Sequence, residues 1–196
     1  MDHARPDRHL DALPHVHRPP VNGVRAPGDG ALRLRPLRES DEAQARQAHA
    51  ELAREDFTFL LDWDPGAPWS QYLQLLRQQR RGLVPEGRVP ATFLAVQVGG
   101  DLVGRVSIRH QLNDHLAAVG GHIGYAVRPG HRGRGYATAV LRQALVVARA
   151  EGVEQVLVTC EESNAASAAV ITRCGGVLED VHVAADGRRT RRYWIR

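Results

Sequence analysis

A run of apolar and aromatic positions, followed by a glycine and arginine loop and then a helical pattern, is the most informative stretch of this sequence. Residues His122 to Val127 are rich in strand-forming side chains, which predicts a buried strand. Pro129 and Gly130 end it. After Gly135 the apolar positions recur at helical spacing. This predicts a helix with one buried face, made of Ala137, Val140, Leu141, Ala144, Leu145 and Ala148.

Shorter patterns of the same kind surround this stretch. Strands are predicted at residues 32–36, 92–98, 102–110, 155–160, 177–183 and 190–195. Helices are predicted at residues 41–54, 69–81 and 164–173, the first capped by Ser40 or Asp41. Gly99-Gly100-Asp101 is typical of a hairpin turn. The predicted fold class is therefore α/β (mixed α+β), with a mostly antiparallel sheet flanked by helices.

The first 30 residues differ from the remainder in composition. They are rich in proline, arginine, histidine and aspartate and show little apolar periodicity, so we expect an N-terminal tail at 1–30 and one domain at 31–196. His3, His9, His15 and His17 offer a metal site as one reading of the tail and a solvated segment as the other. The solvated segment is preferred, and no metal is expected.

Charge favours an anionic ligand. The formal net charge is +4, and all 26 basic residues are arginine. The absence of lysine excludes a P-loop and a lysine Schiff base with pyridoxal phosphate. Aromatic residues make up 5% of the chain and no nucleic-acid module is visible, so no nucleic-acid partner is expected.

Two cysteines provide no disulfide framework, which favours a reducing cytoplasm. No stretch approaches the ~20 apolar residues of a membrane span, so no membrane association is expected. The N-terminus lacks the apolar segment of a secretory signal.

The glycine and arginine loop is a candidate phosphate site. A helix begins with unpaired N–H groups and a partial positive charge, and Arg128, Arg132 and Arg134 add full charges nearby. The alternative is a strand-to-helix turn that needs glycine only for packing. A dinucleotide fingerprint is disfavoured because its third glycine would fall at Thr138.

The segment Arg132-Gly133-Arg134-Gly135-Tyr136-Ala137 resembles motif A of the GNAT superfamily of acyl-CoA N-acyltransferases. The segment Asn164-Ala165-Ala166-Ser167, with Val170 and Gly175-Gly176, resembles that family's second signature. The resemblance covers about residues 32–195. It implies six or seven strands, splayed between the fourth and fifth, with about four helices, and acetyl-CoA as co-substrate.

The resemblance also implies which residues bind acetyl-CoA. The backbone of Tyr125, Ala126 and Val127 would bond the pantetheine arm, and Asn164 with Ser167 would meet the arm or the acceptor. The pyrophosphate would lie on amides beside Arg132, namely those of Gly133, Arg134, Gly135, Tyr136, Ala137 and Thr138. One departure is that the tyrosine many members use to protonate the leaving thiolate would fall at Ile171.

Acetyl transfer to an amine needs a group that accepts the amine proton. His122 is the first candidate, with a histidine satisfied inside the sheet as the alternative, and His110 and Glu161 follow. Asp62 and Asp64 are candidates for holding a cationic amine, and Arg109 and Asn113 for shaping the acceptor pocket. In each case a solvated loop charge is the alternative.

The predicted function is N-acetyl transfer from acetyl-CoA to a primary amine of a small molecule or a protein N-terminus. Cys160 is read as a core residue, not a nucleophile, so direct attack in a ternary complex is expected. The alternative is a non-catalytic acyl-CoA binding or sensing module. The chain is expected to be a monomer or a homodimer.

Overall fold

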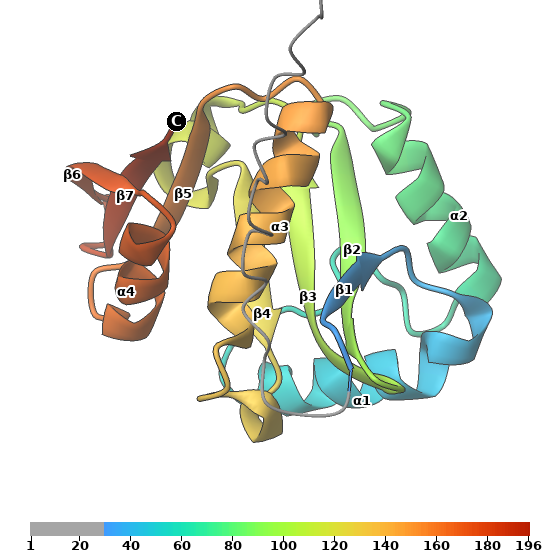
Figure 1. The fold of residues 1–196 in the computed structure, drawn as a ribbon. Coiled ribbons are helices and arrows are strands. Elements are labelled where there is room, and N and C mark those ends of the chain that lie inside the picture. The colour runs from blue at the N-terminus through green and yellow to red at the C-terminus, as the bar shows by residue number, and fades with distance from the viewer. Residues whose placement is uncertain (1–29) are drawn as a thin grey trace, which may run out of the picture.

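The computed structural model describes residues 30–196, and the tail predicted at 1–30 lies almost entirely outside these residues. Two sheets form the centre of the described part, one in the order β1-β2-β3-β4 and the other in the order β5-β7-β6 (Figure 1). All strand pairs are antiparallel. The strands are β1 (Arg33–Arg35), β2 (Ala91–Val98), β3 (Asp101–Arg109), β4 (Ile123–Val127), β5 (Val156–Glu161), β6 (Val177–Val183) and β7 (Arg189–Ile195).

Four α-helices cover these sheets, as the sequence predicted. They are α1 (Glu42–Ala53), α2 (Trp69–Arg80), α3 (Tyr136–Ala150) and α4 (Ala165–Arg173). Short helical turns are η1 (Glu39–Asp41), η2 (Leu116–Gly120) and η3 (Pro129–His131). Side chains of α1 and α2 form one buried cluster with β2, and side chains of α3 and α4 form the other with both sheets. Among residues 30–196, no helix is long and apolar enough to cross a membrane.

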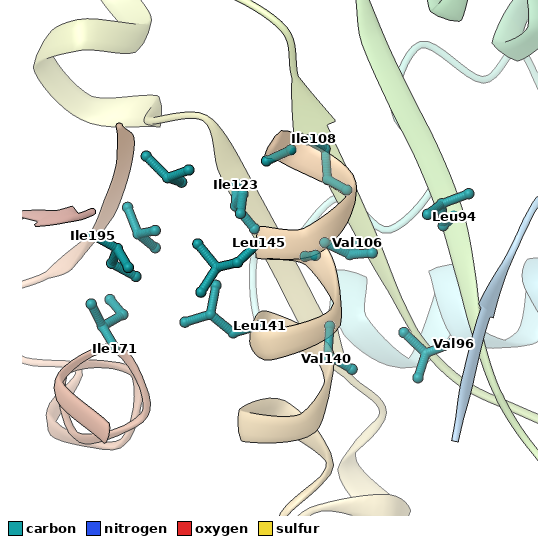
Figure 2. Close-up of a cluster of buried hydrophobic side chains, with 14 of the residues drawn as sticks. Leu94, Val96, Val106, Ile108, Ile123, Val140, Leu141, Leu145, Ile171 and Ile195 are labelled. Carbon is teal, nitrogen blue, oxygen red and sulfur yellow. The ribbon is translucent and has the colours of Figure 1, made fainter. Parts of the chain in front are cut away.

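The predicted apolar face of α3 is confirmed. Val140, Leu141 and Ala144 have no exposed surface, and Leu145 is 5% exposed. Leu141 and Leu145 extend toward Ile171 and Ile195 on one side, while strands β3 and β4 pack on the other (Figure 2). One helix therefore packs against both sheets, and its buried leucines, at about 1.5–3 kcal/mol each, help hold them together.

Strands β4 and β5 are neighbours at one end only. The amide of His122 donates to the carbonyl of Leu157 at 2.7 Å, and beyond that point no ladder joins the two strands. Gly121 makes the close approach possible, because a Cβ at its φ of +63° would lie 2.6 Å from the Leu157 oxygen. The predicted splay between the fourth and fifth strands is thus present.

Candidate functional site

A cleft of about 720 Å³ opens where β4 and β5 part. Its walls come from β4, the loop after it, the first turn of α3 and one face of α4. Of the twelve residues predicted to bind the cofactor, all but Arg134 line this cleft. They are Tyr125, Ala126, Val127, Arg132, Gly133, Gly135, Tyr136, Ala137, Thr138, Asn164 and Ser167.

The loop before α3 presents unpaired amides to this cleft. Gly133 and Gly135 have φ angles of +75° and +77°, a conformation that favours glycine, and a Cβ at either position would meet open space. Within residues 30–196, the amides of Gly133, Arg134 and Gly135 donate to no acceptor, and the first helical bond is made by Ala139. Consecutive free amides at a helix start suit a phosphate group.

The three arginines of this region have different environments. Arg132 binds Glu55 through both terminal nitrogens, at 3.1 and 2.5 Å, and both side chains are exposed. Arg134 is exposed. Arg128 is buried instead, where it binds Glu51 at 2.7 and 2.8 Å. Arg128 is therefore neutralised by Glu51 and does not add the free charge beside the phosphate loop that the sequence suggested.

A hydrogen bond crosses the cleft between β4 and α4. The hydroxyl of Tyr125 lies 3.0 Å from Oγ of Ser167, and burial raises the pKa of Tyr125 to about 12. Asn164 caps α4 by accepting the amide of Ser167 at 2.9 Å. Ile171 has no exposed surface and lies in the core, so the position of the expected family tyrosine does not face the cleft. Tyr125 of β4 is instead the tyrosine whose hydroxyl bonds across this cleft.

His122 is held within the structure as a hydrogen-bond acceptor. It is 8% exposed, and its Nδ1 accepts the amide of Leu157 at 2.9 Å. Burial and the charge of Arg109 lower the pKa of its imidazole. Because Nδ1 is occupied by a donor, the neutral ring carries its proton on Nε2 and has no free lone pair. This geometry matches the alternative reading, a histidine satisfied inside the sheet.

The other two base candidates lie at different strand ends, His110 just after β3 and Glu161 at the end of β5. The ring of His110 lies 2.9 Å from the hydroxyl of Thr92. Gly104 pairs with Val127 at the end of β4, and His110 comes six residues after Gly104 along the extended chain. His110 is therefore about 20 Å from that end of β4. Glu161 ends β5 and is exposed. Val156, Val158 and Cys160 of that strand face the core, so the alternation of a strand turns Glu161 to the opposite side.

The two acids predicted to hold a cationic amine bind other groups of the protein instead. Asp62 forms an ion pair with Arg88 and accepts from Gln79 at 3.0 Å. Asp64 accepts the amide of Gly66 at 2.8 Å in a turn. Both line a separate groove of about 340 Å³ beside α2, so the structure does not bring them to the main cleft.

Asn113 and Arg109 mainly organise the loop before β4. Asn113 accepts the amide of Leu116 at 2.9 Å and donates to the carbonyl of Gly87 at 3.0 Å. Arg109 donates to the carbonyls of Gly120 and Gly121.

Two features were missed from the sequence. Phe57, which follows α1, lines the cleft. Arg105 is 4% exposed on β3, and its guanidinium lies 4.7 Å from the ring centre of Phe57. A charged residue inside the apolar run of residues 102–108 is the signal that points to it.

Comparisons with known proteins agree with this geometry. Residues 31–177 match the sequence model described as Acetyltransferase (GNAT) domain. A comparison with curated protein sequences gives no match. Among residues 30–196, no group of three or more histidine, cysteine or acidic residues is placed to hold a metal ion.

Three solved structures illustrate the shared fold. RimJ of Mycobacterium smegmatis in complex with CoA-disulfide is 22% identical, with 85% of this chain and 82% of that chain covered and a TM-score of 0.61. The protein yncA of Salmonella typhimurium with its cofactor acetyl-CoA is 16% identical, with 85% and 94% covered and a TM-score of 0.58. RimL, a ribosomal L7/L12 alpha-N-protein acetyltransferase in complex with coenzyme A, is 20% identical, with 84% and 93% covered and a TM-score of 0.59.

Proposed function

The chain belongs to the GNAT family of acetyltransferases, and from that we propose that it transfers the acetyl group of acetyl-CoA to a primary amine. The observation that carries the proposal is the cleft between the parted ends of β4 and β5, with unpaired amides at the start of α3. The acceptor is the amine of a small molecule or of a protein N-terminus. RimL, described as an alpha-N-protein acetyltransferase, supports including protein N-termini.

The residues of the cleft fit acetyl-CoA by kind and by position. Among residues 30–196, no strand pairs with Tyr125, Ala126 and Val127 on the β5 side of β4, so the backbone of this edge is open to pairing with the pantetheine arm. The amides from Gly133 to Thr138 would hold the pyrophosphate, and Arg132 would add a charge. The thioester supplies an activated acetyl group for attack by the amine.

Glu161 is the base candidate that we favour. Its carboxylate forms no ion pair with any residue from 30 to 196, and it ends β5, the strand that parts from β4. It would accept the amine proton, directly or through water. His122 would serve mainly to join β4 to β5 at the closed end.

Tyr125 is the candidate for protonating the thiolate that leaves. Its raised pKa keeps the hydroxyl protonated at neutral pH, and Ser167 orients it across the cleft. This assignment supplies the proton donor that Ile171 cannot provide.

Cys160 supports direct attack over a covalent enzyme intermediate. It is buried in the core, and burial raises the pKa of its thiol, which disfavours the nucleophilic thiolate. Incubation with acetyl-CoA alone should therefore leave the mass of the protein unchanged. A stoichiometric acetyl adduct on Cys160 would replace direct attack with a two-step transfer.

The proposal is tested by measuring thiol release from acetyl-CoA across a panel of amines, metabolites and N-terminal peptides. Turnover with at least one amine is expected, and it should be lost when the amine is omitted. Tight acetyl-CoA binding without turnover on any amine would favour the sensing module. Failure to bind acetyl-CoA would refute both.

A further inference from the structure

Two arginines of β3 lie on the face of the sheet opposite α3. Arg105 and Arg109 are four residues apart, so both side chains project to the same face of the strand. Val106 and Ile108, which alternate with them, lie in the core under α3. Arg105 is 4% exposed, and Arg109 is partly buried.

Neither arginine has a carboxylate partner among residues 30–196. Arg105 donates to the carbonyls of Gly124 and Thr58, both at 3.0 Å, and its Nε is buried without a partner. Within this described part, Arg109 donates only to the carbonyls of Gly120 and Gly121. Burial and the charge of Arg109 lower the pKa of Arg105 to about 9. A buried cation such as Arg105 with a second, partly buried cation nearby is costly, and an anionic ligand would offset that cost.

The two guanidinium groups converge beside Gly124. A Cβ at this residue would lie 3.6 Å from Nη1 of Arg109, 3.7 Å from Nη1 of Arg105 and 3.8 Å from Nη2 of Arg109. Because glycine has no side chain, the Cβ position that faces the two guanidinium groups is left unfilled. Gly124 is partly exposed and directly precedes Tyr125 and Ala126, which line the cleft. The positive space therefore adjoins the region where the acetyl group would be transferred.

We propose that Arg105 and Arg109 bind a carboxylate or phosphate group of the acceptor in the space beside Gly124. This inference rests on the proposed acetyltransferase function and narrows its acceptor to amines that carry a negative charge. Arginine suits such a group because its planar fork matches the oxygen geometry of carboxylates and phosphates. The acceptor amine would then point toward the end of β4, where the cleft opens.

The first test compares peptide amides that carry an anionic side chain with matched neutral peptides. Tripeptides with a glutamate at position 1, 2 or 3 are compared with their glutamine equivalents, and phosphoserine peptides with serine peptides, by thiol release. The anionic member should have a kcat/KM at least 10-fold higher, mainly through KM. A larger ratio of kcat/KM in the glutamate series would indicate a carboxylate, and a larger ratio in the phosphoserine series would indicate a phosphate.

In Arg109→Gln, the ratio of kcat/KM between the anionic and the neutral peptide should fall close to one. The matched control is Arg77→Gln, which removes the same charge from an exposed position on α2 and should keep the ratio. Turnover without preference for the anionic member, or a preference that Arg109→Gln retains, overturns the inference while the acetyltransferase function stands. No thiol release from any amine instead counts against the function.

A binding measurement tests whether Arg105 and Arg109 bind an anionic group even if no turnover is found. The arginine Nε–H signals of ¹⁵N-labelled protein are followed during titration with N-acetylated Ser-Glu-amide or Ser-Gln-amide. The glutamate probe should shift the signals of Arg105 and Arg109, and the glutamine probe should not. Gly124→Ala, which fills the space, should weaken this response. Equal responses to both probes, or none, would assign the arginines a structural role only.

Discussion

Tyr125 of β4 and Ser167 of α4 are joined by a hydrogen bond of 3.0 Å between their hydroxyl oxygens, across the cleft where acetyl-CoA would lie. If Tyr125 protonates the leaving thiolate, Tyr125→Phe should lower kcat about 10-fold. This loss is smaller than the ~10²–10⁴ typical of a positioned acid or base, because a thiolate leaves readily. The KM for acetyl-CoA should change little.

Ser167→Ala is the matched variant for this relationship, since it removes only the orienting partner. Its kcat should lie between those of the wild type and Tyr125→Phe. With a pKa of about 12 for Tyr125, deprotonation of this group should not reduce kcat below about pH 10. Unchanged kcat in Tyr125→Phe would remove it from the mechanism.

Glu161→Gln tests the proposed base. The amide cannot accept the amine proton, so kcat/KM should fall by about 10²-fold or more at neutral pH, and the loss should diminish at high pH, where more of the amine is already neutral. His110→Gln is the comparison, and we expect a smaller loss because His110 lies far from the cleft. The reverse order of losses would exchange their roles.

The predictable parts of this structure are those set by residues close in sequence. The face of α3 follows from its periodicity, and the cleft residues follow from two contiguous motifs, one before α3 and one at the start of α4. The base candidates were harder, because the sequence places His122 on a strand but does not show that Leu157 occupies its Nδ1.

Charge pairing between distant residues is what the sequence could not supply. Asp62 resembled a free loop acid, yet Arg88, 26 residues on, neutralises it. Arg128 resembled a phosphate ligand, but in the structure its guanidinium binds the carboxylate of Glu51. For Arg105 the reverse holds, because only the structure shows that its guanidinium has no carboxylate partner among residues 30–196.

Gly135→Ala tests the phosphate loop. Its φ of +77° should cost an alanine about 1–2 kcal/mol, and the altered loop should weaken acetyl-CoA binding. Gly152→Ala is the control, because Gly152 has a φ of +86° and open space around it, but lies at the other end of α3. Both variants should lose similar stability in urea unfolding. Only Gly135→Ala should lose affinity in calorimetry, and equal affinities would mean that the loop is not the site.

His122→Asn tests the join between β4 and β5 through pH. The pKa of His122 is lowered in the folded protein, so the unfolded state binds more protons as the pH falls below about 6.5. Its contribution to stability is therefore present above that pH and is lost as the pH falls toward the lowered pKa. Asparagine can accept the Leu157 amide without titrating.

The free energy of unfolding of His122→Asn should thus decline less between pH 7 and 5 than that of the wild type. His49 and His110, whose pKa values are also lowered by burial, remain in both proteins and cancel in the comparison. Parallel curves for wild type and His122→Asn would show that this histidine titrates equally in both states.

Glu55→Gln tests whether Arg132 is shared between a carboxylate and the cofactor. Arg132 and Glu55 both line the cleft and bind each other through two hydrogen bonds, so Glu55 competes with an incoming pyrophosphate. Removing its charge should tighten acetyl-CoA binding a few-fold, because an exposed pair is worth only about 0–1 kcal/mol. Arg132→Ala should weaken binding instead. Both effects should shrink as salt is added.

Glu42→Gln is the control for this competition. Glu42 pairs with Arg46 on α1 at similar exposure, but neither residue lines the cleft. The variant should leave the Kd for acetyl-CoA unchanged at every salt concentration. If Glu55→Gln weakened binding as Arg132→Ala does, Glu55 would act by positioning Arg132 for the phosphate, since the guanidinium would then need its carboxylate to stay in place.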